Sequence, residues 1–202
     1  MSQPVAAAVV LAAGAGKRFG GPKALLRIDG ELLVDRAVRV AHAAECAPVF
    51  VVLGAGAADV VQAARLDDAV VLVNDDYATG MGSSLRCALA ALGDHQAPAA
   101  VVLLVDQPRV GPETVRRLVD AWRDGARAAV ASYGDQPRNP VLLDATTWSE
   151  VSATAKDDVG AREWLRAHAD DVVLVACDDL GSDIDIDTPD DLDRLHHLEA
   201  QP

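Results

Sequence analysis

Hydrophobic and polar positions along the chain alternate between short apolar runs and longer amphipathic stretches. Short apolar runs are typical of buried strands, and apolar residues spaced three or four positions apart are typical of helices. The runs predict strands over residues 5–11, 48–53, 69–73, 99–105, 128–132, 141–143 and 172–176. The amphipathic stretches predict helices over residues 32–44, 57–65, 82–92, 112–125 and 160–168, and a last helix from residue 188. This alternation favours an α/β fold in which helices cover a mostly parallel sheet.

The first apolar run leads directly into a loop that is rich in glycine and in positive charge. The loop contains Gly14, Gly16, Lys17, Arg18, Gly20, Gly21 and Lys23. Glycine permits positive φ angles, and backbone amides that turn toward one ligand form an anion-binding nest. The three cations add full positive charge, so the loop is predicted to hold the phosphates of a nucleotide. The structural alternative is a tight strand-to-helix turn with solvated cations.

The spacing of these glycines differs from that of two common phosphate loops. A Walker A loop requires a lysine directly after its second glycine, but Pro22 follows Gly21. The dinucleotide fingerprint requires Gly-x-Gly-x-x-Gly, whereas one more residue separates Gly16 from Gly20. Pro22 would also interrupt a helix that starts there.

Asp106 follows the most apolar run, residues 99–105, which we expect to form the central strand. Carboxyl ends of parallel strands line the ligand crevice of open α/β sheets. Pro108 turns the chain away and leaves the carboxylate at the rim. Asp106 is therefore a candidate ligand for Mg²⁺, which prefers one or two carboxylates together with phosphate oxygens. A turn-capping aspartate is the alternative.

Two further segments carry candidate chemistry. The glycine-containing loop over residues 79–85 leads into a predicted helix, for which Ser83 is the expected N-cap. Its free amides could donate hydrogen bonds to a base edge or a phosphate. Near the end of the chain, Asp183, Asp185 and Asp187 alternate with apolar residues and would share one face of an extended segment. Three carboxylates on one face repel one another unless a cation or solvent relieves them; a solvated acidic edge is the alternative.

These motifs, in this order, resemble those of the molybdenum cofactor cytidylyltransferases and guanylyltransferases, the MobA-like NTP transferases. Leu11 to Lys23 is similar to the family's Leu-Ala-Ala-Gly signature with its following arginine and lysine, and the resemblance extends to Leu192. It implies a Rossmann-like nucleotidyltransferase fold of three α/β/α layers, in a single domain over residues 1–202. It also implies transfer of a nucleoside monophosphate to the phosphate of molybdopterin, with release of pyrophosphate and Mg²⁺ as cofactor.

The resemblance implies roles for individual residues. The residues expected to bind the nucleotide are Leu11, Ala12, Ala13, Gly14, Gly16, Lys23, Gly80, Gly82 and Ser83. Those expected to act in catalysis are Arg18, Lys23 and Asp106. The expected metal ligands are Asp106 and Asp187, with Asp185 as the alternative to Asp187. Asn139, in the segment Arg138-Asn139-Pro140, and Arg162 are expected to contact the acceptor. The segment before Arg162 departs from the family pattern at Lys156 and around Asp158.

Composition limits the partners and the compartment. The net charge of −13 argues against binding of a nucleic-acid polymer. The sequence contains no apolar run of the ~18 to 20 residues that cross a bilayer. Three isolated cysteines, Cys46, Cys87 and Cys177, fit reduced side chains in a cytoplasmic protein. The expected partners are small-molecule substrates, a nucleoside triphosphate and the molybdopterin cofactor, and a client molybdoenzyme.

Several functions stay open at this point. Ala13 favours CTP, because its methyl group would narrow the base pocket against a purine, but GTP and another phosphorylated acceptor remain alternatives. An NAD(P)H-dependent oxidoreductase is an alternative of another class, since Lys17 and Arg18 could hold a 2′-phosphate. A non-catalytic carrier that binds the cofactor without turnover is a third.

Overall fold

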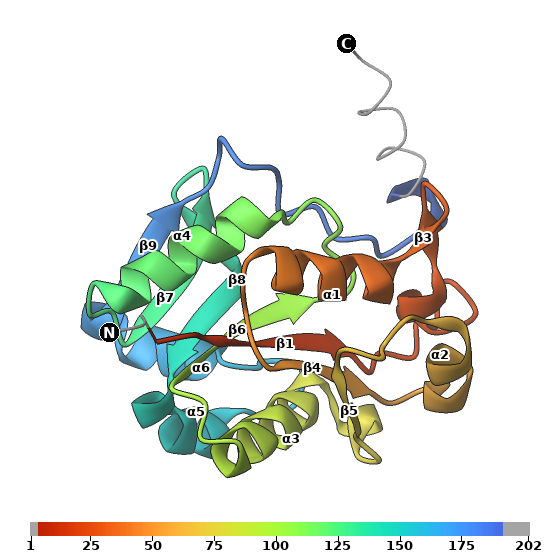
Figure 1. The fold of residues 1–202 in the computed structure, drawn as a ribbon, viewed down its shortest axis with the longest axis horizontal. Helices are drawn as coiled ribbons and strands as arrows, with labels where there is room; N and C mark the ends of the chain where they lie inside the picture. The colour runs from red at the N-terminus through yellow and green to blue at the C-terminus, as the bar shows by residue number, and fades with distance from the viewer. Residues whose placement is uncertain (1–3, 192–202) are drawn as a thin grey trace.

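The computed structural model describes residues 4–191, in which seven strands form one sheet with the order β5-β4-β1-β6-β8-β7-β9 (Figure 1). The strands are β1 (Ala7–Ala12), β4 (Val49–Leu53), β5 (Val70–Val73), β6 (Ala99–Leu104), β7 (Ala128–Tyr133), β8 (Gln136–Asp144) and β9 (Val172–Ala176). β8 runs antiparallel to both of its neighbours, and the other pairs are parallel. The predicted mostly parallel sheet is confirmed, and β6 lies at its centre as expected.

Helices cover both faces of the sheet and complete three layers (Figure 1). The helices are α1 (Leu33–Ala43), α2 (Ala57–Ala63), α3 (Met81–Asp94), α4 (Pro112–Arg123), α5 (Trp148–Thr154) and α6 (Arg162–Ala167). α1, α2 and α4 pack on one face, and α3, α5 and α6 pack on the other. The predicted three-layer α/β/α architecture is therefore confirmed, whereas a single domain over residues 1–202 stays a prediction.

The core consists mainly of alanine, valine and leucine from the central strands. All six residues of β1 are buried, and they alternate between the two faces because successive side chains of a strand point in opposite directions. Leu11 of β1 pairs with Leu104 of β6. The carboxyl ends of the two central strands are thus level, which brings the loops that follow them to one edge of the sheet.

The hairpin of β7 and β8 is longer than the sequence pattern predicts. The prediction gave a strand over residues 141–143 after a polar loop, but β8 already begins at Gln136. Gly134 and Asp135 form the turn with φ angles of 55° and 60°, as expected in a type I′ hairpin. The first residues of β8 are polar because this part of the strand lies at the surface, and they therefore resemble a loop in the sequence.

Some smaller elements also differ from the predictions. α5 was not predicted, because only Trp148 and Val151 of its seven residues are buried and give little periodicity. A short 3₁₀ helix, η1 (Lys23–Leu25), and the hairpin of β2 (Arg27–Ile28) and β3 (Glu31–Leu32) follow the glycine loop. The last helix begins as predicted after Thr188, and its continuation lies outside the described residues.

Within residues 4–191, every helix is too short or too polar to cross a bilayer.

Candidate active site

Lys23 joins two carboxylates that are far apart in the sequence. Its Nζ atom lies 2.7 Å from Oδ2 of Asp106 and 2.7 Å from Oδ1 of Asp187. Lys23 opens η1 after the glycine loop, Asp106 follows β6, and Asp187 lies in the segment after β9. The Lys23 and Asp106 side chains are only 17% and 23% exposed, whereas that of Asp187 is 54% exposed. The structure therefore brings three predicted site residues together at the edge where β6 ends.

The charge state of Lys23 follows from these contacts. Burial alone would lower the pKa of its ammonium, but the hydrogen bonds to Asp106 and Asp187 outweigh this effect and raise the pKa above its ordinary value of 10.5. Lys23 therefore stays protonated at neutral pH and neutralises much of the negative charge of the two aspartates.

The acidic segment is fixed by its apolar residues. Ile186 is fully buried, and its amide donates to the carbonyl oxygen of Asp106 over 2.9 Å. The alternation predicted from the sequence then directs Asp185 and Asp187 away from the core. Among the described residues, Lys23 donates to Asp187 and not to Asp185, and desolvation together with the charge of Asp106 raises the pKa of Asp185. Asp187 is thus the carboxylate that pairs with Lys23, and the choice between the two as metal ligands stays a prediction.

The glycine loop is shaped for an anion. Gly16 has a φ angle of 54°, and a β-carbon there would overlap the carbonyl oxygen of Gly21. Within residues 4–191, the amides of Gly14, Ala15 and Gly16 find no hydrogen-bond acceptor in the protein. They are therefore free to donate to an anion, and phosphate binding by this loop stays a prediction. Leu11, Ala12 and Ala13 come before this loop and were also predicted to bind the nucleotide. All three are buried at the end of β1.

The exposed cations of this loop lie outside the cluster of Lys23, Asp106 and Asp187, the Lys23 cluster. Lys17 and Arg18 are both exposed. Neither makes an ion pair or a side-chain hydrogen bond with any residue in the described part of the chain. Arg18 is thus free to reach a ligand, and its catalytic role stays a prediction.

The expectation of free amides at the second glycine loop is wrong. The amide of Gly82 donates to the carbonyl oxygen of Asp157 over 2.7 Å, and that of Met81 donates to Oδ1 of Asp158 over 3.2 Å. A β-carbon on Gly82 would lie 2.8 Å from the backbone nitrogen of Lys156. These glycines therefore allow close packing against residues 155–158, and contact of Gly80 or Gly82 with a nucleotide stays a prediction.

Ser83 is not the N-cap that the sequence suggested. α3 begins at Met81, with Gly80 as its N-cap, so Ser83 already lies within the first turn. Its hydroxyl accepts a hydrogen bond from Nδ2 of Asn74 and donates one to the carbonyl oxygen of Gly80, over 2.8 and 2.9 Å. Ser83 is 5% exposed. The side chain therefore stabilises the loop from inside, which the sequence could not reveal because Asn74 belongs to another segment.

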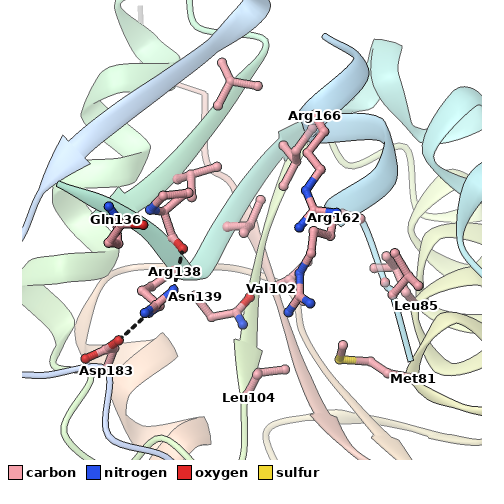
Figure 2. Close-up of a pocket in the computed structure, with 18 of the residues that line it drawn as sticks. Met81, Leu85, Val102, Leu104, Gln136, Arg138, Asn139, Arg162, Arg166 and Asp183 are labelled. Atoms are coloured by element: carbon pink, nitrogen blue, oxygen red, sulfur yellow. Dashed lines mark hydrogen bonds and ion pairs between the residues drawn. The ribbon is translucent and has the colours of Figure 1, made fainter. Parts of the chain in front are cut away.

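A pocket of about 800 Å³ lies beside the Lys23 cluster and opens between β8, β9, α6 and the start of α3 (Figure 2). Both residues predicted to contact an acceptor, Asn139 and Arg162, line it. Gln107 and Asp185 also line it, and they are close neighbours in sequence of Asp106 and Asp187. The pocket therefore borders the site around Lys23, although Lys23, Asp106 and Asp187 do not line it themselves.

Two further arginines line the pocket and received no role in the sequence analysis. Arg138 of β8 forms an ion pair with Asp183, with Nε and Oδ2 2.6 Å apart (Figure 2). Arg166 lies on α6 four residues after Arg162, on the same side of the helix. That i,i+4 spacing was the signal that could have identified Arg166.

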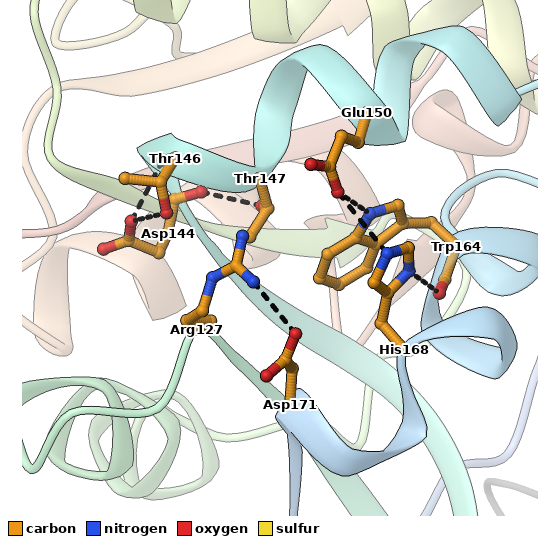
Figure 3. A network of polar contacts seen from close by, with 8 residues as sticks. All are labelled: Arg127, Asp144, Thr146, Thr147, Glu150, Trp164, His168 and Asp171. Carbon is orange, nitrogen blue, oxygen red and sulfur yellow. Dashed lines mark hydrogen bonds and ion pairs between the residues drawn. The ribbon is translucent and has the colours of Figure 1, made fainter.

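α6 is held in place by a polar network with α5 (Figure 3). Oε2 of Glu150 accepts a hydrogen bond from Nε1 of Trp164 over 2.9 Å and lies 3.5 Å from Nε2 of His168. The rings of Trp164 and His168 stack at a centroid distance of 4.4 Å. Glu150 therefore fixes the helix that presents Arg162 and Arg166 to the pocket.

The carboxylates of Asp106 and Asp187 are suited to a divalent cation whose other ligands come from the substrate. Among residues 4–191, no group of three or more His, Cys, Asp or Glu side chains is arranged to hold a metal ion. Asp106 and Asp187 instead supply two carboxylates at one point. Mg²⁺ and similar hard cations are commonly bound by one or two carboxylates, with phosphate oxygens and water completing the shell.

Comparison with known proteins gives a family and a set of relatives. Residues 8–178 match the family model of the MobA-like NTP transferase domain. The chain is 40% identical over 200 residues to the nicotine blue oxidoreductase of Paenarthrobacter nicotinovorans, a match that covers 95% of this chain and 97% of that protein.

Solved structures give the same fold. Rv0371c from Mycobacterium tuberculosis H37Rv has a TM-score of 0.82 and 34% identity, covering 96% of this chain and 98% of that one. The complex of Rv0371c with manganese has a TM-score of 0.79 and 33% identity, covering 98% and 100%. A nucleotidyl transferase from Methanothermobacter thermautotroptrophicus has a TM-score of 0.78 over 98% and 99% of the chains. Its 22% identity supports the shared fold alone.

Proposed function

Because the chain belongs to the MobA-like NTP transferase domain family, we propose that it transfers a nucleoside monophosphate from a nucleoside triphosphate to a phosphorylated acceptor. The observation that carries this proposal is the bridge from Lys23 to Asp106 and Asp187, beside a glycine loop with free amides. CTP as donor, molybdopterin as acceptor and a client molybdoenzyme are the finer parts that the sequence resemblance adds.

The proposed reaction needs no protein nucleophile. An oxygen of the acceptor phosphate attacks the α-phosphorus and forms a new P–O bond. The bond from the α-phosphorus to the oxygen that bridges to the β-phosphorus breaks, and pyrophosphate leaves with that electron pair. The acceptor phosphate is already ionised, so the attack requires no general base. The protein's part is to position both substrates and neutralise the charge that develops.

Each residue of the site has a role in this scheme. The free amides of residues 14–16 hold the triphosphate, and Arg18 and Lys23 neutralise charge on the α-phosphate and the pyrophosphate. Asp106 and Asp187 would hold a divalent cation. When bound, such a cation would further neutralise the phosphates and help to orient them. Mg²⁺ is the proposed ion, and the manganese complex of the similar Rv0371c supports a divalent metal in general terms.

The choice of CTP rests on Ala13, which is 6% exposed at the end of β1. A single methyl group discriminates between bases by only about 1–3 kcal/mol, so GTP is the alternative donor. Nucleoside triphosphates are cytoplasmic metabolites, and we place the reaction in the cytoplasm for that reason.

A second candidate function is reduction of an organic substrate by a dinucleotide. The observation that favours it is the 40% identity to nicotine blue oxidoreductase over nearly the full length of both proteins. The exposed Lys17 and Arg18 would then hold the 2′-phosphate of NADPH. In that scheme the paired carboxylates have no direct part in the chemistry.

Thermal shift measurements separate the two candidates, because a ligand that binds only the folded state raises the melting temperature. The wild type and Asp106→Asn are compared with CTP, GTP, ATP, UTP and NADPH, each with Mg²⁺, with Mn²⁺ and without metal. A metal-dependent shift with CTP, reduced in Asp106→Asn, is the expected result. A shift with NADPH alone, indifferent to metal and to the substitution, would overturn nucleotidyl transfer in favour of reduction.

A further inference from the structure

The pocket beside the Lys23 cluster combines an apolar wall with positive charge, of which the protein pairs only a part. The wall includes Leu11, Met81, Leu85, Val102, Leu165 and Leu174. The positive charge comes from Arg138, Arg162 and Arg166 (Figure 2). Three arginines around one pocket are notable in a chain whose net charge is −13.

The three arginines are not equivalent. Arg138 is paired with Asp183 at 2.6 Å. Arg162 and Arg166 are both exposed, and neither forms an ion pair with another residue of the part that the structure describes. They lie one turn apart on α6, so their guanidinium groups can contact one anionic group together. Charge complementarity therefore calls for a ligand with an anionic end at α6.

The other side chains of the pocket limit how polar the uncharged part of that ligand can be. Gln107, Gln136 and Asn139 are the uncharged polar side chains among the pocket residues, and Asp183 and Asp185 are the acidic ones. Arg138 pairs with Asp183, and Gln107 forms a hydrogen bond with Asp185, so these groups already have partners in the protein. A polar heterocycle such as a pterin has donors and acceptors around its ring edge, and each one buried without a partner is unfavourable. An apolar body loses nothing on leaving water and gains contacts with the aliphatic wall.

We propose that this pocket binds an organic anion with an apolar, aromatic or aliphatic body, held at its charged end by Arg162 and Arg166. A volume of about 800 Å³ suits a molecule of two or three fused rings with its substituents. That this ligand is the second substrate rests on the proposed nucleotidyl transfer, and the ligand would then take the place of molybdopterin as acceptor. Gln107 and Asp185, close neighbours in sequence of Asp106 and Asp187, line the pocket. Binding itself does not depend on the reaction.

The test uses two bicyclic carboxylates of similar size, 2-naphthoate and pterin-6-carboxylate, titrated calorimetrically into the full chain. We expect 2-naphthoate to bind at least about tenfold more tightly than the pterin. Arg162→Met and Arg166→Met should each weaken 2-naphthoate about tenfold, because each removes a charge-assisted contact. Arg65→Met is the matched control, since Arg65 is exposed and lies outside the pocket.

A wall variant tests the apolar part separately. Leu174 is 51% exposed, so Leu174→Asn should fold normally while it weakens 2-naphthoate and leaves the pterin unchanged. Tighter binding of pterin-6-carboxylate, unchanged naphthoate affinity in both arginine variants, or no binding of either compound would each overturn the proposal.

The proposal and the proposed function fail in distinguishable ways. Asp106→Asn should lose metal-dependent nucleotide binding and keep its affinity for 2-naphthoate. If the wild type shows no metal-dependent nucleotide binding but binds 2-naphthoate through Arg162 and Arg166, nucleotidyl transfer is wrong and the ligand class of the pocket stands.

Discussion

Lys23 and Asp106 are separated by 83 positions in the sequence, yet Nζ of the lysine lies 2.7 Å from Oδ2 of the aspartate. The contact joins the loop after β1 to the end of β6, the two central strands of the sheet. Because Asp187 receives a second hydrogen bond from the same ammonium, a change at any one of the three alters the charge balance of the other two.

Asp106→Asn should weaken metal-dependent binding of CTP about tenfold or more, because one of the two carboxylates that would hold the cation is lost. Titration of CTP in the presence of Mn²⁺ measures the effect. Asp120→Asn is the matched control, since Asp120 is an exposed aspartate on α4 that pairs only with Arg123 in the described residues. Equal CTP affinity in wild type and Asp106→Asn would contradict the assignment.

Removal of the lysine should have the opposite effect on the metal alone. Lys23 occupies the same carboxylate oxygens that a cation would use. In the absence of nucleotide, Lys23→Met should therefore bind Mn²⁺ about tenfold more tightly than the wild type. Manganese titration followed by electron paramagnetic resonance checks this. An affinity equal to or below that of the wild type would show that the two aspartates do not form the cation site.

The stability of the protein should depend on the charge of Lys23 at high pH. The folded state raises the pKa of this ammonium above 10.5, so it holds the proton more tightly than the unfolded state does. The stabilisation is complete below the unfolded pKa and is lost as the pH rises through the folded pKa. Urea unfolding at about pH 9 and about pH 11.5 should show the advantage of wild type over Lys23→Met shrinking at the higher pH. A constant difference would argue against the ion pairs.

Gly16→Ala should destabilise the glycine loop. The new β-carbon would overlap the carbonyl oxygen of Gly21, and a φ of 54° is unfavourable for alanine. The expected loss in the free energy of unfolding is more than about 1 kcal/mol. Gly14→Ala is the control, because nothing lies within 4 Å of its added β-carbon, and its stability should change by less than about 0.5 kcal/mol. Chemical denaturation of both variants would reject this account if they were equally stable.

Glu150→Ala should loosen the attachment of α6. Trp164 is 1% exposed, and its Nε1 would lose the acceptor that Glu150 provides. An unpaired buried donor is unfavourable by about 1–3 kcal/mol. Glu163→Ala, at an exposed acidic position on α6, should stay within about 0.5 kcal/mol of the wild type. Similar melting curves for the two variants would mean that this network does not hold the helix.

The strands and the approach of Lys23 to Asp106 were predictable for related reasons. Uninterrupted apolar runs are buried from both faces, and residues that follow the neighbouring parallel strands β1 and β6 reach the same edge. Asp187 could be named only from the family resemblance, because it follows β9, which pairs with β7 and is not a neighbour of β6. The engaged amides of Met81 and Gly82 were not predictable, because their acceptors belong to residues 157 and 158, which pair with them only in the folded chain. Arg166 received no role because its spacing from Arg162 shows only that the two share one side of a helix, whereas the pocket that they line forms only in the folded chain.

Because β8 is antiparallel to β6, the proposed nucleotide-binding loops and the pocket-lining residues of β8 belong to different parts of the sheet. Since β8 runs against β6, its amino end, with Arg138 and Asn139, lies beside the carboxyl end of the central strand. The loops after the parallel strands β1 and β6 thus carry the residues proposed to bind a nucleotide. The hairpin that turns at Gly134 and Asp135 carries residues that line the adjoining pocket. A hairpin tip can change in length and sequence without displacing the loops after β1 and β6. Ligand choice can therefore diverge between relatives of this fold while the framework around Lys23 is retained.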